Sequence, residues 1–152
     1  MRTILFSLLG LTASLALGLA FLAAEQPAGP EHHAHAFEQC AKACNDCQRS
    51  CDSCATHCRN LLAQGKKDHE TTLRTCLDCA DFCAAAARIT ARQGVFSDLI
   101  CNDCAEACQR CGKECAKFDD EHMKKCAEEC SKCEKACREM LKHIAQAKEN
   151  AK

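Results

Sequence analysis

The fold is decided by the stretch from residue 40 to residue 58, which reads CAKACNDCQRSCDSCATHC. Its six Cys follow one another at steps of 4, 3, 4, 3 and 4 residues. Alternating steps of three and four keep side chains on one face of an α-helix, in the register of an inward-facing bundle seam. The stretch therefore predicts a helix whose buried seam is made of Cys, where Leu, Ile or Val usually stands.

Three later segments carry the same seam. Their Cys lie at positions 76, 79 and 83, at 101, 104, 108, 111 and 115, and at 126, 130, 133 and 137. Residues 101–115 (CNDCAEACQRCGKEC) share five Cys at identical spacing with residues 44–58, and both segments begin with Cys-Asn-Asp-Cys. This echo indicates either a duplicated helical hairpin, which makes the first and third segments equivalent, or common selection for a Cys seam.

The fold class expected from these seams is all-α, an antiparallel four-helix bundle with a Cys-lined core over residues 33–148. The helices are expected over about residues 33–63, 68–93, 98–117 and 119–148. Gly65 is expected to end the first helix, and Asp68, Ser97 and Asp119 or Asp120 to cap the N-termini of the others. The connections are short, so consecutive helices should be antiparallel.

The N-terminal part has a different composition. Residues 1–24 begin with Arg2 and continue as an uncharged, mostly apolar run, which is typical of a secretory signal peptide or an uncleaved anchor. Either reading places the Cys-rich part outside the cytoplasm, in the periplasm or another extracytoplasmic space. Residues 25–32 are expected to be a flexible linker. His32, His33 and His35 could capture a metal ion from such a tail or be solvated there.

Composition excludes several functions. The formal charge of −1 and the lack of a basic patch disfavour nucleic-acid binding. The chain has no Gly-rich phosphate loop, no Ser-His-Asp set and no carboxylate pair on a seam, so we expect no enzyme. Cys accounts for 18 of 152 residues, about 12% of the chain, which is the level of a disulfide scaffold or a metal-rich protein.

Metal binding explains a helical Cys seam best, because Cys residues one turn apart present two sulfurs on one face. Zinc held by four thiolates leaves two negative charges per buried site, whereas one Cu(I) per thiolate gives a nearly neutral core. We therefore expect many Cu(I) ions. A disulfide-stapled structural or thiol redox-buffering module and a zinc or cadmium sink stay open as alternatives. The candidate metal ligands are Cys40, Cys44, Cys47, Cys51, Cys54, Cys58, Cys76, Cys79, Cys83, Cys101, Cys104, Cys108, Cys111, Cys115, Cys126, Cys130, Cys133, Cys137, His57 and Met123.

The seams, together with His57-Cys58 and the segment CGKECAKF at residues 111–118, resemble the bacterial copper storage proteins. The resemblance implies a Cys-lined four-helix bundle that holds many Cu(I) ions in its core, commonly as a tetramer; with the leader, this predicts copper storage or detoxification outside the cytoplasm. It also implies a copper donor or acceptor protein and a copper path through one end of the bundle, where His57 matches the family's His. Exported relatives carry a twin-Arg leader, whereas this leader has only Arg2, and residues 60–71 contain no Met.

Other polar residues near the ends of the seams carry weaker expectations. His57 lies three residues after Cys54, and Met123 lies three residues before Cys126, so both can point towards the metal. His69 and His122 belong to the same end of the bundle and are secondary candidates. At the opposite end, Met140 is expected in the core with Phe37 and Ile144, and His143 in solvent.

Overall fold

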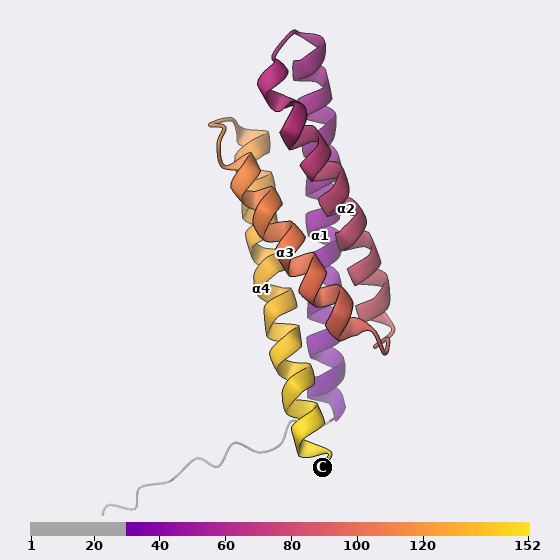
Figure 1. The fold of residues 1–152 in the computed structure, drawn as a ribbon. Coiled ribbons are helices and arrows are strands. Elements are labelled where there is room, and N and C mark those ends of the chain that lie inside the picture. Colours follow the sequence, from indigo (N-terminus) through magenta and orange to yellow (C-terminus); the bar gives the residue numbers. More distant parts are fainter. Residues whose placement is uncertain (1–29) are drawn as a thin grey trace, which may run out of the picture.

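Four long helices make up the part of the chain that the structure describes (Figure 1). The computed structural model describes residues 30–152, with side chains from residue 33 onward. The helices are α1 (Pro30–Ala63), α2 (Glu70–Ala91), α3 (Ser97–Cys115) and α4 (Glu121–Asn150), and a single 3-10 turn, η1 (Lys67–His69), precedes α2. Residues 30–152 contain no strand, so the expected all-α class is confirmed for the described chain.

The helices are arranged as a closed square. Each one packs against two neighbours, in the order α1–α2, α2–α3, α3–α4 and α4–α1, which places α1 diagonally across from α3. Short connections make consecutive helices antiparallel, as expected (Figure 1). The two hairpins α1–α2 and α3–α4 thus lie side by side, with the similar sequences of α1 and α3 in equivalent positions.

Two of the expected helix ends are confirmed. Gly65 adopts φ +86°, which only Gly accepts readily, and the amide of Lys66 then reaches back 3.1 Å to the carbonyl of Leu61. Asp120 caps α4, because its side chain accepts a hydrogen bond of 3.1 Å from the amide of Met123.

The N-caps expected at Asp68 and Ser97 are wrong. Asp68 lies inside η1, and α2 begins after His69 without a side-chain cap. Ser97 is already the first residue of α3, and its hydroxyl donates a hydrogen bond of 2.6 Å to the carbonyl of Gly94. The chain turns here through Gln93 at φ 51°, a left-handed conformation that sequence reasoning did not assign.

The bundle interior is built from small side chains. All eighteen Cys are buried, none more than 2% exposed, and Ala residues such as Ala86 and Ala105 fill the spaces between the helices. Longer apolar side chains lie at the two ends, where Met123 and Met140 are buried. Charged side chains occupy the outer faces.

Nothing is described for residues 1–29, so the expected signal peptide or anchor and most of the expected linker lie outside the described residues. Helix α1 starts three residues earlier than expected, which places His33 and His35 on a helix and corrects their assignment to a mobile tail. Between residues 30 and 152, no helix combines the length and hydropathy that crossing a membrane requires.

Candidate metal centre

The eighteen thiols form one continuous ladder along the bundle axis, which we call the thiol core. Neighbouring sulfurs from different helices lie between 3.5 Å (Cys83–Cys108) and 4.0 Å (Cys40–Cys137) apart. The ladder starts at Cys40 and Cys101, whose sulfurs are 3.8 Å apart, and reaches Cys76 and Cys115, 3.6 Å apart, towards the other end. The seams expected on all four helices therefore meet in space.

Within this ladder the sulfurs gather in overlapping groups of four, in each of which all Sγ atoms lie within 4.8 Å of one another. Five such groups are Cys44–Cys104–Cys133–Cys137, Cys47–Cys51–Cys79–Cys130, Cys47–Cys83–Cys108–Cys133, Cys51–Cys111–Cys126–Cys130 and Cys54–Cys76–Cys115–Cys126. Cys51 and Cys130 each belong to two groups. A sulfur shared in this way can bridge two ions, so the groups are linked rather than separate sites.

The spacing of the sulfurs suits soft metal ions. A metal–sulfur bond of about 2.3 Å places three sulfurs around one ion about 4.0 Å apart, and four sulfurs about 3.8 Å apart. The distances in the thiol core already have these values, so ions can enter with little movement of the helices. The distances alone fit either coordination number, and the charge balance of the core decides between metals.

The arrangement differs from a disulfide framework, in which each Cys has one assigned partner. Cys51 has three sulfurs from other helices at almost equal distances: Cys111 at 3.9 Å, and Cys126 and Cys130 at 3.8 Å each. All eighteen Cys are free thiols. No pairing is singled out by the geometry around Cys51.

Hydrogen bonds between thiols distribute protons unevenly in the thiol core. The bond with Cys115 lowers the pKa of Cys111 to about 6, because a thiolate is stabilised by thiols that donate to it. The bond with Cys111 raises the pKa of Cys130, so Cys130 keeps its proton. The thiol of Cys111 therefore loses its proton more readily than that of Cys130.

One end of the bundle, which we call the mouth, brings the two predicted non-Cys ligands together. His57 of α1 stacks on His122 of α4, with ring centroids 4.3 Å apart, and its Nε2 lies 3.4 Å from a carboxylate oxygen of Asp120. The thiol of Cys54 donates to the Met123 sulfur at 3.4 Å. Imidazole, thioether and thiol thus succeed one another from the outside inwards.

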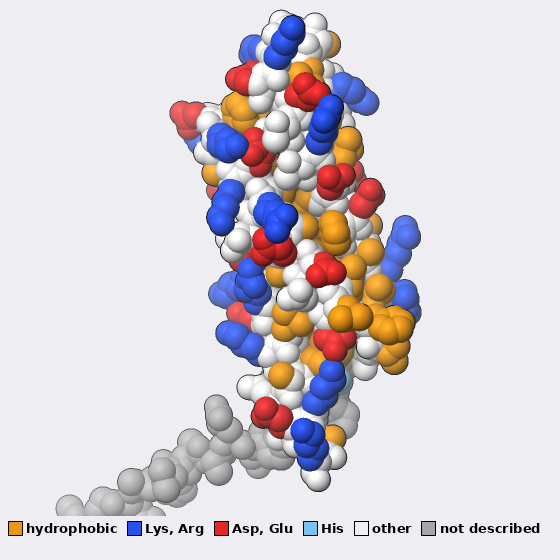
Figure 2. Space-filling view, viewed as in Figure 1, with side chains coloured by type: hydrophobic (Ala, Val, Ile, Leu, Met, Phe, Trp, Pro, Cys, Tyr) orange, Lys and Arg blue, Asp and Glu red, His pale blue; other side chains and the backbone are white. Residues whose placement is uncertain are grey.

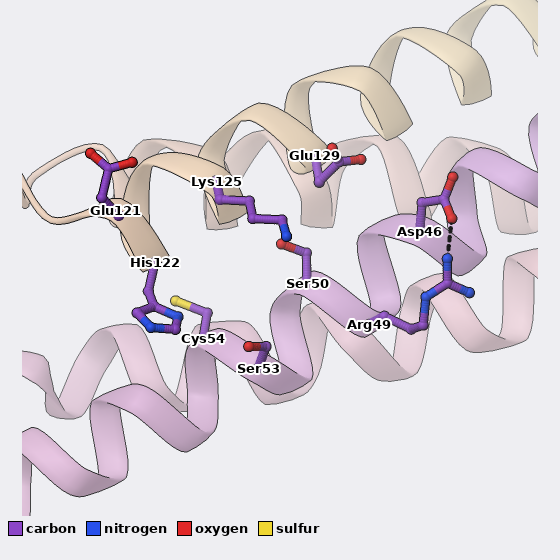
Figure 3. Close-up of a pocket in the computed structure, with 9 residues that line it drawn as sticks. All are labelled: Asp46, Arg49, Ser50, Ser53, Cys54, Glu121, His122, Lys125 and Glu129. Atoms are coloured by element: carbon purple, nitrogen blue, oxygen red, sulfur yellow. Dashed lines mark hydrogen bonds and ion pairs between the residues drawn. The ribbon is translucent and has the colours of Figure 1, made fainter.

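A groove of about 470 Å³ opens beside the mouth, between α1 and α4 (Figure 3). Figure 3 shows the ring of His122 close to Cys54 from the facing helix, with Ser50 and Ser53 further along α1. The small serines leave room for solvent, so the groove brings water close to a thiol of the core. Acidic and basic side chains share its rim, including Glu121 and Lys125.

His69, a secondary ligand candidate, is buried, and the expectation that His143 lies in solvent is wrong. His69 is only 6% exposed and stacks on Phe118 at 4.3 Å, and its buried Nδ1 has no hydrogen-bond partner in the described chain. His143 is not simply solvated, because it is half-buried and its Nε2 lies 2.6 Å from Nδ1 of His33. Met140, by contrast, is buried, as expected. Spacing could have revealed His143, which lies three residues beyond Met140.

Fold and site together define a metal-binding four-helix bundle with a thiol-lined core. A protein-family model described as "Copper storage protein" matches residues 33–142 of the chain. The chain therefore belongs to the copper storage protein family, as the sequence resemblance implied.

Solved relatives carry the same fold. The chain is 36% identical to the Cu(I)-bound copper storage protein BsCsp3, with a TM-score of 0.65 over 70% of this chain and 98% of that one. It is 34% identical to a cytosolic copper storage protein from Streptomyces lividans with five coppers, with a TM-score of 0.66 over 72% of this chain and 94% of that one. A cysteine-rich protein of Bacillus subtilis, YhjQ, is 38% identical over 56% of this chain and 81% of its own length.

Proposed function

We propose that the protein binds and stores many Cu(I) ions through the thiolates of the thiol core, and that it has no enzymatic role. The observation that carries this proposal is the sharing of sulfurs such as Cys51 and Cys130 between four-sulfur groups. A protein built for one or two structural ions has separate ligand sets, whereas shared sulfurs allow bridged ions along the whole axis. A Cu(I)-bound relative that is 36% identical supports the choice of metal.

Charge balance favours Cu(I) over Zn(II). Between residues 33 and 152 the interior holds no Lys or Arg side chain, since the buried residues other than Cys are apolar, Thr, Ser or His. Zinc bound to four thiolates would leave a net charge of about −2 per ion in this interior, and burying unpaired charge costs several kcal/mol. One Cu(I) for each thiolate cancels the charge, and each bond formed replaces an S–H proton.

The mouth provides the path by which copper reaches the thiol core. His57 and His122 meet the ion first, and the Met123 sulfur, 3.4 Å from Cys54, receives it next. All eighteen Cys, His57 and Met123 are assigned as copper ligands in this proposal. Each transfer passes the ion between neutral or anionic soft donors, so copper is never left without ligands.

Location and partners are the finer part of the proposal. The apolar run in residues 1–24, after Arg2, supports export, so copper would be stored outside the cytoplasm. A copper donor or acceptor protein would then exchange ions at the mouth. We propose no nucleic-acid partner, because the formal charge of −1 leaves the chain without an excess of basic residues.

An exposed apolar patch supports self-association, for which the family resemblance implies a tetramer. Figure 2 shows orange side chains gathered over α2, α3 and their connection. The large apolar side chains that are exposed in the described chain all come from α2, α3 and their connection: Leu77, Phe82, Val95, Phe96 and Leu99. A second copy of the chain placed on this face would remove these side chains from water.

The decisive experiment is an anaerobic titration of the reduced protein with Cu(I) against a competing chelator, with a parallel Zn(II) titration. Saturation near one Cu(I) per Cys, about 14–20 ions, supports a bridged thiolate core. Saturation at one to four ions of either metal contradicts storage. Protein with alkylated thiols is the control and should bind none of this copper.

The disulfide alternative is tested by counting free thiols in protein isolated from its native compartment without added reductant. Storage as the resting role requires most of the eighteen thiols to react with a thiol reagent under denaturing conditions or to be released by copper removal. Mostly oxidised Cys would instead favour the redox-buffering module.

A further inference from the structure

The end of the bundle opposite the mouth, which we call the far end, repeats the arrangement of the mouth. At the mouth, α4 carries Met123 three residues before Cys126. At the far end, α4 carries Met140 three residues after Cys137. Both Met side chains are buried, at 0% and 2% exposure. Each end of the thiol core is therefore closed by one thioether from the same helix.

Each of these two ends also carries a pair of imidazoles from α1 and α4. At the mouth the pair is His57–His122, with ring centroids 4.3 Å apart, and at the far end it is His33–His143, with centroids 4.6 Å apart. The far-end pair is the more closely directed of the two, because Nδ1 of His33 faces Nε2 of His143 at 2.6 Å. In such an N–H···N hydrogen bond, the shared hydrogen lies where a metal ion would lie between two imidazole ligands.

The seam of α1 continues from the thiol core to this pair. His33, Phe37 and Cys40 follow one another at steps of four and three, the spacing of the Cys seam itself. Phe37 is 6% exposed, and its ring packs edge-on against two imidazoles. The ring centroids lie 5.0 Å from His33 and 6.4 Å from His143. Behind it lies the first rung of the ladder, where the sulfur of Cys40 is 3.8 Å from Cys101 and 4.0 Å from Cys137.

Solvent reaches the far end as well as the mouth. A groove of about 300 Å³ is lined by His33, Phe37 and Ile144 and by the α2–α3 connection. The ion pair of Lys148 with Asp98, at 2.9 Å, stands at this groove and leaves it without net charge. Cys40, the first thiol of the α1 seam at this end, is buried at 2% exposure. The groove therefore brings solvent to the imidazole of His33, while the thiols behind it stay covered.

From these observations we propose that the far end is a second copper port, in which His33 and His143 bind a Cu(I) ion and pass it by Met140 to Cys40, Cys101 and Cys137. The inference rests on the proposed storage of Cu(I) and extends it, because the thiol core then exchanges copper at both ends.

Binding at this pair is balanced in protons and requires a small movement. A neutral imidazole has one lone pair, so the nitrogen that now donates must shift its proton to its other ring nitrogen before it binds the ion. Metal–nitrogen bonds of about 2.0 Å separate the two nitrogens by about 3.3 Å in a bent arrangement and about 4 Å in a linear one. The rings therefore move apart by about 1 Å, which rotation of two half-buried side chains can provide.

The test measures the initial rate of anaerobic Cu(I) transfer from a weakly binding coloured chelator to the reduced protein. Four proteins are compared: the wild type, a far-end variant (H33A/H143A), a mouth variant (H57A/H122A) and the combination of both. His35→Ala is the matched control, since His35 lies on the same turn of α1, is exposed and contacts Gln39 at 2.9 Å. Circular dichroism and thermal midpoints check that each variant folds.

We expect the mouth variant to keep loading and the combined variant to load at least three-fold more slowly than the mouth variant. His35→Ala should match its parent. Met140→Leu in the mouth variant is the second test, because it keeps the volume at this position and removes only the thioether. Equal rates for the mouth variant and for both derivatives of it would overturn the second port. If they coincide while every protein still saturates near one Cu(I) per Cys, storage stands. Saturation of the wild type at a few ions would refute storage itself.

Discussion

Asp120 joins the start of α4 to the copper mouth, and two substitutions separate these roles. Its carboxylate accepts a hydrogen bond from the Met123 amide at 3.1 Å and lies 3.4 Å from Nε2 of His57. Asp120→Ala removes both the cap and the charge. Asp120→Asn removes the charge but keeps a side-chain oxygen, and Asn is as good an N-cap as Asp.

The expected magnitudes follow from these contacts. Loss of an N-cap costs about 1 kcal/mol. For about 120 ordered residues the unfolding entropy is about 0.25 kcal/mol per kelvin, so Asp120→Ala should lower the melting temperature by about 4 °C. Asp120→Asn should leave it within about 1 °C of the wild type, because the contact of the Asp120 carboxylate with His57 is partly exposed and such contacts contribute little.

Copper loading should respond differently. Both variants lose a negative charge at the mouth, and a partly solvated charge attracts a passing cation by about 0.3–1 kcal/mol. Initial loading should therefore be about two- to five-fold slower in both, with unchanged capacity. Thermal unfolding of the apo protein and chelator-transfer kinetics provide the two measurements. Equal destabilisation by Asn and Ala would refute the capping role, and loading at the wild-type rate in both would refute the electrostatic one.

Three further predictions concern the backbone, the thiols and the metal. Gly65→Ala should destabilise the apo protein by about 1 kcal/mol, because φ +86° is strained for Ala, while Gln64→Ala beside it should change little; denaturant titration checks both. Burial raises the pKa of Cys58 to about 12, so the stability from its neutral thiol is complete below about pH 8.5 and is lost as the pH rises towards 12. Cys58→Ala should therefore make the unfolding free energy fall less steeply with pH in this range. A fall as steep as that of the wild type would contradict the raised pKa of Cys58. Copper loading at pH 7 should release about one proton per thiol bound, which a pH-stat measures, and no proton release would mean that the thiols are not the ligands. Removal of copper with a chelator should lower the melting temperature of the loaded protein.

The helices and the thiol core could be predicted because one chemical type marks the seam. Cys at alternating steps of three and four defines both the helical period and the inward face, so the burial of Cys40 and of Cys137 followed from spacing alone. The resemblance to the copper storage proteins implied the mouth, and spacing made His57 and Met123 candidate ligands there, since each lies three residues from a seam Cys. Which sulfurs face one another across the bundle depends on the relative height of four helices, and no single helix carries that information.

The helix ends were less predictable, because hydrogen bonds there compete locally. Asp68 and Ser97 are residues that cap helices, yet Asp68 lies in a 3-10 turn, and Ser97 uses its hydroxyl on the carbonyl of Gly94. The assignment of His143 to solvent failed for another reason. Its partner His33 was placed in a tail, and a contact between residues 110 positions apart appears only when both helices are in place.

The seam also determines how the capacity of such a protein can grow. A storage protein that forms a closed shell holds ions in proportion to the enclosed volume, so a larger capacity requires a new shell. The thiol core, by contrast, can be extended in one dimension, along the helix axes. Seven more residues in each of the four helices would add two seam positions per helix, about eight thiols, with the cross-section and the charged outer faces unchanged. Helix α3, with 19 residues, is the shortest of the four described helices. Lengthening it would therefore be the first step towards a protein that binds more ions.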